Sequence, residues 1–379
     1  MKAADFKKRP KFVTLRNDLN KIVEVLSLKS YEIIGPIVSE NAVVYDAISS
    51  LDELPIGFHD QQDNASYRLT KSDDKSLFGY ASSPHSWKKY LYPPVQKLWE
   101  ARKTKSGFEI IKNNEEVPKR AFIGVRSCEL NAIAIHDKIF LDGPYADPSY
   151  KKRRDNVFII AVNCTHPSGT CFCVSMNTGP KAITGFDLAL TEVIEKGRHY
   201  FVVEVGSEAG AEILKEVPCN PAGDKEIEAA DKKVENASNN MGRKLNAAGI
   251  KNLLQRNFEN PYWEKIAARC LTCGNCTMVC PTCFCTTIED TTDLSGQIAQ
   301  RRRVWDSCFT LDFSYIAGGS IRISPMSRYR QWMMHKLAAW HDQFGMSGCV
   351  GCGRCITWCP AGIDITEEAS IIEESEINK

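Results

Sequence analysis

The chain has 379 residues, which is enough for two or three domains with separate cores. Its 48 basic and 47 acidic residues nearly balance, so no overall charge predicts binding to nucleic acid or to an anionic membrane surface. The amino-terminal residues lack the apolar segment of a signal peptide, and no stretch reaches the ~20 apolar residues of a membrane span. We therefore expect a cytoplasmic protein, whose sixteen cysteines bind metal or stay reduced rather than form disulfides.

Residues 1–218 alternate short apolar runs with amphipathic stretches. Three runs are rich in β-branched and aromatic residues, as buried strands are: 121–125, 157–162 and 200–205. The amphipathic segments 129–140 and 187–195 predict helices between strands. This alternation predicts an α/β domain with a mostly parallel or mixed sheet.

Four cysteines follow the first two of these predicted strands. Cys128 comes after the first strand, and Cys164, Cys171 and Cys173 come after the second. Loops at the carboxyl ends of parallel strands share one sheet edge, where α/β proteins build their sites. The four thiols are therefore candidate ligands of a 4Fe–4S cluster, which needs four thiolates. Zinc on the same thiolates and unliganded buried thiols are the alternatives.

Residues 219–254 are polar and charged, which predicts a linker or an exposed helical insertion. Cys219 at its start is interpreted as an incidental thiol. Gly206 and Gly210, after the third predicted strand, indicate a tight turn rather than a phosphate site. The sequence contains no G-x-G-x-x-G motif after a strand, no P-loop and no H-E-x-x-H pattern. No nucleotide or catalytic site is therefore predicted from motifs.

The segment 255–379 contains one cysteine pattern twice. Each copy reads C-x2-C-x2-C-x3-C-P, with Cys270, Cys273, Cys276 and Cys280 in the first and Cys349, Cys352, Cys355 and Cys359 in the second. This is the ligand run of bacterial ferredoxins. Zinc needs only four ligands and does not account for a third cysteine at the same interval or for the repeated proline. The pattern therefore predicts two 4Fe–4S clusters and a role in electron transfer.

The fourth cysteine of such a run usually ligates the other cluster in two-cluster ferredoxins. We therefore expect crossed ligation. One cluster would have Cys270, Cys273, Cys276 and Cys359 as ligands, and the other would have Cys349, Cys352, Cys355 and Cys280.

The two runs are 68 residues apart, and the segment between them predicts a helix over 328–344. The cluster domain is therefore expected to be α-helical, similar to the ferredoxin modules of succinate dehydrogenase and heterodisulfide reductase. His335 and His341 on this helix are interpreted as packed or surface residues, because cysteines already supply every ligand. Cys283, Cys285 and Cys308 are interpreted as packing residues or as neighbours that tune a cluster without ligating it.

Several motifs together resemble a known family. They include PHSWKKYLYPP (84–94), GVRSCELNAI (124–133), CLTCGNCTMVCPTCFC (270–285), WDSCFTLDFSYIAGGS (305–320) and CVGCGRCITWCP (349–360). Over nearly its whole length the chain resembles the beta subunit of cytoplasmic NiFe sulfhydrogenases and the A subunit of anaerobic sulfite reductases. The resemblance implies a subunit that relays electrons from an FAD- and NAD(P)-binding flavoprotein subunit to a catalytic partner. That partner would be a NiFe hydrogenase pair or a sirohaem sulfite reductase.

Two other functions remain open from the sequence. The α/β domain could bind its own flavin or substrate, which would make the chain an oxidoreductase subunit with an active site. Alternatively, the clusters could only stabilise the fold of an assembly module, as structural metals do.

Overall fold

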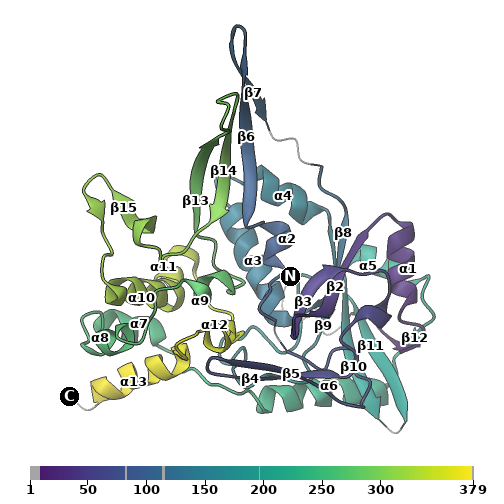
Figure 1. Ribbon diagram of the computed structural model, residues 1–379. Helices are drawn as coiled ribbons and strands as arrows, with labels where there is room; N and C mark the ends of the chain where they lie inside the picture. The colour runs from purple at the N-terminus through teal and green to yellow at the C-terminus, as the bar shows by residue number, and fades with distance from the viewer. Residues whose placement is uncertain (1–8, 82, 113–115, 196, 378–379) are drawn as a thin grey trace.

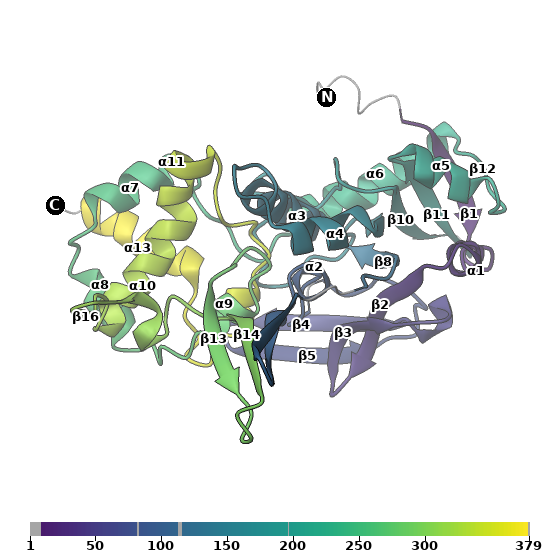
Figure 2. The same cartoon turned by 90° about the horizontal axis from the view of Figure 1, so that it is seen from above.

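The structure is a computed structural model that describes residues 9–81, 83–112, 116–195 and 197–377. A sheet-rich half contains most of the amino-terminal part of the chain, and a helical half contains most of the carboxyl-terminal part (Figures 1 and 2). The first eight residues, whose sequence predicts no signal peptide, lie outside the described residues.

The main sheet has eight strands in the described part of the chain, in the order β12-β1-β11-β10-β9-β8-β2-β3. Its strands are β1 (Lys11–Leu15), β2 (Glu32–Ser39), β3 (Ala42–Ala47), β8 (Arg120–Val125), β9 (Val157–Val162), β10 (Leu188–Glu195), β11 (Arg198–Val205) and β12 (Asn220–Pro221). The four central strands β2, β8, β9 and β10 are parallel, whereas β3, β11, β1 and β12 join antiparallel. The strands predicted at 121–125, 157–162 and 200–205 are confirmed, and so is a mixed sheet.

The helix predicted over 187–195 is wrong, because this segment forms β10. Its polar residues Asp187, Thr191, Glu192 and Glu195 have the spacing of one helix face, but Thr191 and Glu192 are buried. The Glu192 carboxylate accepts the backbone N–H groups of Leu77 at 2.7 Å and Phe78 at 3.0 Å, and it lies 2.8 Å from His199 Nε2. With its polar group satisfied, the segment is buried between β9 and β11 as a strand.

Helices cover both faces of this sheet. They are α1 (Lys21–Leu28), α2 (Lys88–Leu91), α3 (Ser127–Phe140), α4 (Pro148–Asp155), α5 (Glu208–Leu214) and α6 (Asp224–Asn239), with a single 3₁₀ turn, η2 (Leu51–Glu53), nearby. Ile123 and Ile160 face a core with α1 and α5, whereas Phe122 and Ile159, one position earlier on the same strands, face a core with α3 and α4. This alternation is the two-residue period of a strand buried on both sides. The predicted helix 129–140 is confirmed as α3.

The polar segment 219–254 contains α6 and the start of α7. Ala230, Val234 and Ala237 on α6 are buried, and Ala230 packs against Tyr200 and Val202 of β11. The opposite face of α6 is exposed, which accounts for the polar composition. One face of this segment is thus part of the core of the main sheet. The domain boundaries at 218/219 and 254/255 remain predictions from the sequence.

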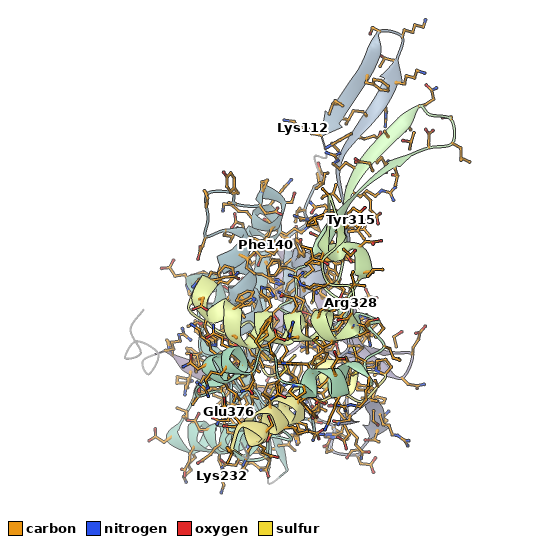
Figure 3. All side chains as sticks on the ribbon, turned by 90° about the vertical axis from the view of Figure 1, so that its left-hand side faces the viewer. Lys112, Phe140, Lys232, Tyr315, Arg328 and Glu376 are labelled. Carbon is orange, nitrogen blue, oxygen red and sulfur yellow. The ribbon has the colours of Figure 1, made fainter. Side chains whose placement is uncertain are left out.

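A second sheet joins the two halves. Its order is β13-β14-β6-β7, formed by β6 (Val95–Thr104), β7 (Gly107–Lys112), β13 (Thr286–Thr292) and β14 (Ile298–Trp305). It projects from the body as an arm (Figures 1 and 3). Arg303 of β14 also forms an ion pair with Asp147 next to α4. Two small hairpins complete the strands: β4 (Phe58–Asp63) with β5 (Ser66–Lys71), and β15 (Tyr315–Ile316) with β16 (Gly319–Ser320).

The helical half is built from short helices around a core of its own. They are α7 (Ile250–Arg256), α8 (Tyr262–Ala267), α9 (Asn275–Met278), η3 (Leu311–Ser314), α10 (Pro325–Met334), α11 (Trp340–Phe344), α12 (Arg354–Thr357) and α13 (Ile365–Ile377). The predicted helix 328–344 is present as α10 and α11, joined by a π-helical turn, His335–Ala339. Trp332, Met333, Leu337 and Trp340 are buried in it. Among the described residues, no helix has the length and apolar character to span a membrane.

Replacing Glu192 tests the assignment of β10. We expect Glu192→Leu to lower the free energy of unfolding by roughly 1–3 kcal/mol, because the backbone N–H groups of Leu77 and Phe78 lose their acceptor. Glu192→Gln keeps one carbonyl acceptor and should lose less. Chemical denaturation measures both variants, with the exposed Glu195 on the same strand changed to leucine as control. An equal loss in Glu195→Leu would contradict this explanation.

Candidate metal centres

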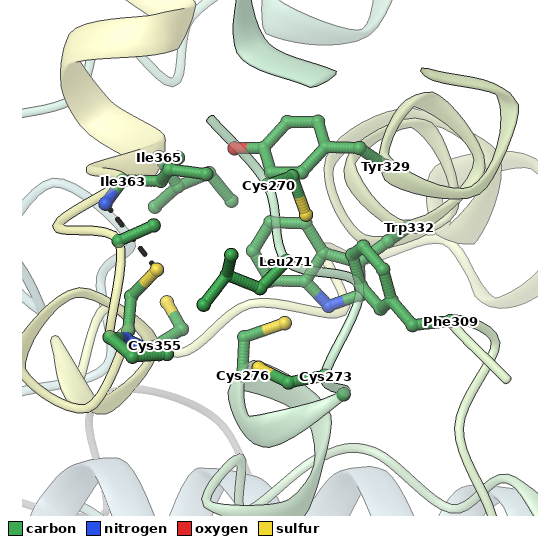
Figure 4. A pocket seen from close by; sticks show the side chains of 14 residues that line it. Cys270, Leu271, Cys273, Cys276, Phe309, Tyr329, Trp332, Cys355, Ile363 and Ile365 are labelled. Carbon is green, nitrogen blue, oxygen red and sulfur yellow. Dashed lines mark hydrogen bonds between the residues drawn. The ribbon is translucent and has the colours of Figure 1, made fainter. Parts of the chain in front are cut away.

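The first cysteine run opens onto a cavity in the helical half. Four cysteines that were predicted to share a cluster line this cavity: Cys270, Cys273, Cys276 and Cys359. Cys355 of the second run also reaches it, and the rings of Phe309, Tyr329 and Trp332 form its aromatic wall (Figure 4). Burial, followed by the neighbouring Cys270 and Cys359 thiols, raises the pKa of Cys276 well above its ordinary value. A metal that binds this thiol therefore has to displace its proton.

The other predicted quartet comes together around the second run. Cys280, Cys349 and Cys352 are each only 8% exposed. Burial raises the pKa of Cys355 well above its ordinary value, and the nearby thiols of Cys349, Cys352 and Cys280 add to this effect. The structure thus places Cys280 with the second run and Cys359 with the first, as crossed ligation requires. Ligation itself stays a prediction.

Both runs have the same local backbone structure. The residue two positions after the first cysteine donates its N–H to that sulfur: Thr272 to Cys270 and Gly351 to Cys349, each at 3.4 Å. Both donors have positive φ, 50° for Thr272 and 64° for Gly351. A glycine with φ of 74° or 75° then precedes the short helix α9 or α12. The repeated sequence therefore builds a repeated sulfur-binding turn, and its N–H···S bonds are among the factors that set a cluster's potential.

The four amino-terminal cysteines also converge. Cys128, Cys164, Cys171 and Cys173 line one cavity, at the carboxyl ends of β8 and β9. Cys352 of the second run lines the same cavity. Burial raises the pKa of Cys171 to about 12, although the Ser168 hydroxyl, 3.1 Å from its sulfur, opposes this. The strand-end argument from the sequence therefore predicted the right neighbours.

A buried arginine borders this amino-terminal cavity. Arg126 is 2% exposed, and its guanidinium donates to the carbonyl oxygens of Phe78 at 2.9 Å and Tyr80 at 2.5 Å. Its Nε is buried and has no hydrogen-bond partner among the described residues. An unpaired buried donor next to four thiols fits an anionic group in the cavity.

Two backbone segments pack closely between this cavity and the second run. Phe172 N–H donates to Gly351 O at 2.8 Å. A Cβ on Gly351 would lie 2.6 Å from Phe172 O, and one on Gly353 would lie 2.3 Å from Thr170 O. No side chain fits at either glycine without moving the neighbouring backbone. These contacts fix the loop of Cys171 and Cys173 against the loop of the second run.

A buried ion pair reinforces this junction. Arg354 Nη2 lies 2.6 Å from Glu129 Oε1, and both side chains are 1% exposed. Glu129 follows Cys128 on α3, and Arg354 precedes Cys355 on α12. Arg354 also donates to Ser83 O at 2.6 Å, and Glu129 accepts from Ser86 Oγ at 2.9 Å. Because removing either charge would leave the other buried and unpaired, the pair holds the two halves in register.

The remaining cysteines of the helical half line a further cavity. Cys283, Cys285 and Cys308 face it, together with His335 and Lys336. Burial lowers the pKa of His335 to about 4, and the charges of Lys336 and Arg322 add to this, so the imidazole is neutral at pH 7. Cys219 lies elsewhere, half-buried beside the core of the main sheet. Among the described residues, no group of three or more His, Cys, Asp or Glu side chains is arranged to hold a single metal ion.

Two cations near these cavities were not predicted from the sequence. Arg126 lies two positions before Cys128, directly after a strand, where its charge could have been read as part of the site. Lys336 lies four residues from both Trp332 and Trp340, on the apolar face of a predicted helix. A charged residue on such a face is the available signal for a buried cation.

The model of a 4Fe–4S dicluster domain matches residues 269–363. Sulfhydrogenase 2 subunit beta of Pyrococcus furiosus is 32% identical over 316 residues, which are 82% of this chain and 89% of that protein. The chain belongs to the sulfhydrogenase beta-subunit family. The resemblance seen in the motifs is thus confirmed, and no solved structure matches the chain. As a member of this family the chain is an iron–sulfur protein with a 4Fe–4S dicluster domain.

Two glycines test the packing of the cysteine loops. Gly351 has φ of 64° and touches the backbone of Phe172, whereas Gly345 has φ of 71° and nothing within 4 Å of an added Cβ. Alanine at either position costs about 1–2 kcal/mol for the left-handed backbone. We expect Gly351→Ala alone to lose iron, because the clash displaces the loop that carries Cys349 and Cys352. Iron and acid-labile sulfide per chain measure this, and equal iron in both variants would contradict it.

Proposed function

We propose that this chain is the iron–sulfur electron-transfer subunit of a hydrogenase-type complex, relaying electrons between an FAD- and NAD(P)-binding flavoprotein subunit and a catalytic subunit. The catalytic subunit would be a NiFe hydrogenase pair or a sirohaem sulfite reductase. The proposal is supported by the relative's name, which is that of a sulfhydrogenase subunit, and by the dicluster domain. We also propose that the chain is cytoplasmic.

Two sets of four thiols would hold two 4Fe–4S clusters. The first set is Cys270, Cys273, Cys276 and Cys359, and the second is Cys349, Cys352, Cys355 and Cys280. The amino-terminal set of Cys128, Cys164, Cys171 and Cys173 would hold a third. When bound, a 4Fe–4S cluster supplies transfer of one electron at a time. The short helices that surround the first two sets would then form a ferredoxin-like domain.

The observation that carries the proposal is that neighbouring sites share cysteines. Cys355, assigned to the second set, also lines the cavity of the first. Cys352, likewise assigned to the second set, also lines the amino-terminal cavity. Neighbouring sites therefore have a cysteine residue in common. This is the contiguity that a relay needs and that isolated structural metal sites do not need.

The side chains around the sites differ in their exposure to solvent. Three of the four cysteines of the second set and two of the four of the amino-terminal set are buried, and the others are half-buried. Cys273 of the first set is exposed, and Leu271 beside it is 64% exposed. We therefore assign the contact with the catalytic subunit to the surface around Cys273. The flavoprotein subunit would then meet the amino-terminal half.

A cleft of about 690 Å³ supports the alternative that this chain binds its own flavin or substrate. It lies beside the amino-terminal cysteines and is lined by Ser127, Pro180 and residues of α6. Ligand pockets have volumes of this order, ~300–1,000 Å³. Retention of flavin by the isolated chain, with bleaching by NAD(P)H, would favour this alternative. Absence of flavin from the isolated chain favours the relay.

Replacing Cys171 tests the third cluster. We expect Cys171→Ser to lose about four irons and four acid-labile sulfides per chain, with one signal lost from the EPR spectrum of the dithionite-reduced protein. Cys219→Ser is the control, because Cys219 lies beside the core of the main sheet. Loss of one zinc with no change in iron would show a zinc site instead. Unchanged iron and zinc would leave the four residues as plain thiols.

A further inference from the structure

Cys283, Cys285 and Cys308 line a single cavity, as the four amino-terminal cysteines do. Its walls are aromatic, with Phe284, Trp332 and Trp340. Trp332 also borders the cavity of the first cysteine run, so the two cavities are neighbours. A cavity with three thiols and an aromatic wall has the composition of the site assigned to the first cluster.

The base of the β13–β14 hairpin brings the three thiols together. Thr286 pairs with Trp305 at the end of the ladder, and Asp306 N–H donates to Cys285 O at 2.9 Å. Cys285 and Cys308 are therefore held beside each other although they are far apart in sequence. Lys88 fixes the preceding turn, because its ammonium donates to the carbonyl oxygens of Cys280 and Cys283, each at 3.0 Å. The thiols are thus placed by backbone contacts from three segments.

A buried ammonium faces the same cavity. Lys336 is 6% exposed, and its Nζ lies 3.1 Å from Thr282 Oγ1, 3.2 Å from Cys280 Sγ and 3.6 Å from Cys283 Sγ. Burying a cation is costly unless negative charge lies nearby. Sulfur is the negative partner that these contacts provide. Lys336 therefore favours thiolates and an anionic group on this side of the cavity.

A fourth candidate ligand comes from the π-helical turn. His335 is its first residue, and its imidazole lines the cavity with the three thiols. Histidine takes the place of cysteine on iron in Rieske centres, so an imidazole can complete a cluster's ligands. Single-turn π-helices are also frequent at functional sites. His341, on the following helix α11, is not among the residues that line this cavity.

We propose that Cys283, Cys285, Cys308 and His335 hold a further iron–sulfur cluster, in addition to those proposed above. The inference concerns what this cavity binds and does not depend on the direction or partners of electron transfer. Lys336 would then lie between this cluster and the second set of cysteines, balancing the negative charge of both. From the sequence these three cysteines were interpreted as packing residues or as neighbours that tune a cluster, and this proposal instead assigns them to one shared site.

The first test compares the double variant C285S/C308S with Cys219→Ser, using the full chain purified without oxygen. We expect the double variant to lose about four irons and four sulfides per chain relative to the control. Iron and sulfide equal to the control would overturn the proposal, and so would loss of zinc instead of iron. Because Cys171→Ser reports a separate loss of iron, this proposal and the third cluster can fail independently.

A second test keeps the proposal falsifiable if the double variant folds poorly. A cluster with an imidazole ligand shows nitrogen hyperfine coupling in pulsed EPR of the reduced protein. We expect this coupling in the wild type and in His341→Gln, and its absence from His335→Cys, which keeps four protein ligands and the wild-type iron content. Coupling that persists unchanged in His335→Cys, or that is absent from the wild type, would overturn the histidine ligand.

Discussion

The packing of the loop 170–173 against the loop 351–353 is the contact on which the arrangement of cysteines depends. Two glycines, Gly351 and Gly353, let these backbones approach more closely than any residue with a Cβ would allow. The contact places the amino-terminal cysteines beside the second cysteine run, so that Cys352 borders both sites. The buried pair of Glu129 and Arg354 crosses the same junction and opposes any sliding of one half over the other. The cysteine-lined cavities of the two halves thereby lie next to one another, with Cys352 at their boundary.

The cavities differ in whether a buried cation lies beside them. Arg126 borders the amino-terminal cavity, and Lys336 lies between Cys280 and Cys283. A cluster gains one negative charge on reduction, so a buried cation beside it favours the reduced state. The first cavity has an aromatic wall and an exposed cysteine, Cys273, and water can screen its charge. Net charge, exposure and N–H···S bonds set cluster potentials, and the first two of these differ among the sites.

The sequence predicted those features that depend on local pattern. The strands β8, β9 and β11 follow from runs of β-branched residues, and α3 follows from its amphipathic period. The amino-terminal cysteines were placed together because parallel strands end at one sheet edge. The pattern failed at β10, where the buried Thr191 and Glu192, together with Asp187 and Glu195, have the spacing of a polar helix face. Its carboxylate is satisfied by backbone groups from residues 77 and 78, which no local pattern reveals.

The sequence by itself determined the ligand chemistry, because the interval between cysteines within a run sets which thiolates one short turn can present to a cluster. It also indicated the family, because several motifs along the chain resemble those of one family. Only the tertiary structure decided that Cys352 shares the amino-terminal cavity and that Cys283, Cys285 and Cys308 share another cavity. Cys308 reaches Cys285 through the β13–β14 hairpin, and Cys352 reaches Cys171 through contacts between two glycine-containing loops. Such proximity depends on long-range backbone pairing and on buried charge, neither of which leaves a periodic signal along the chain.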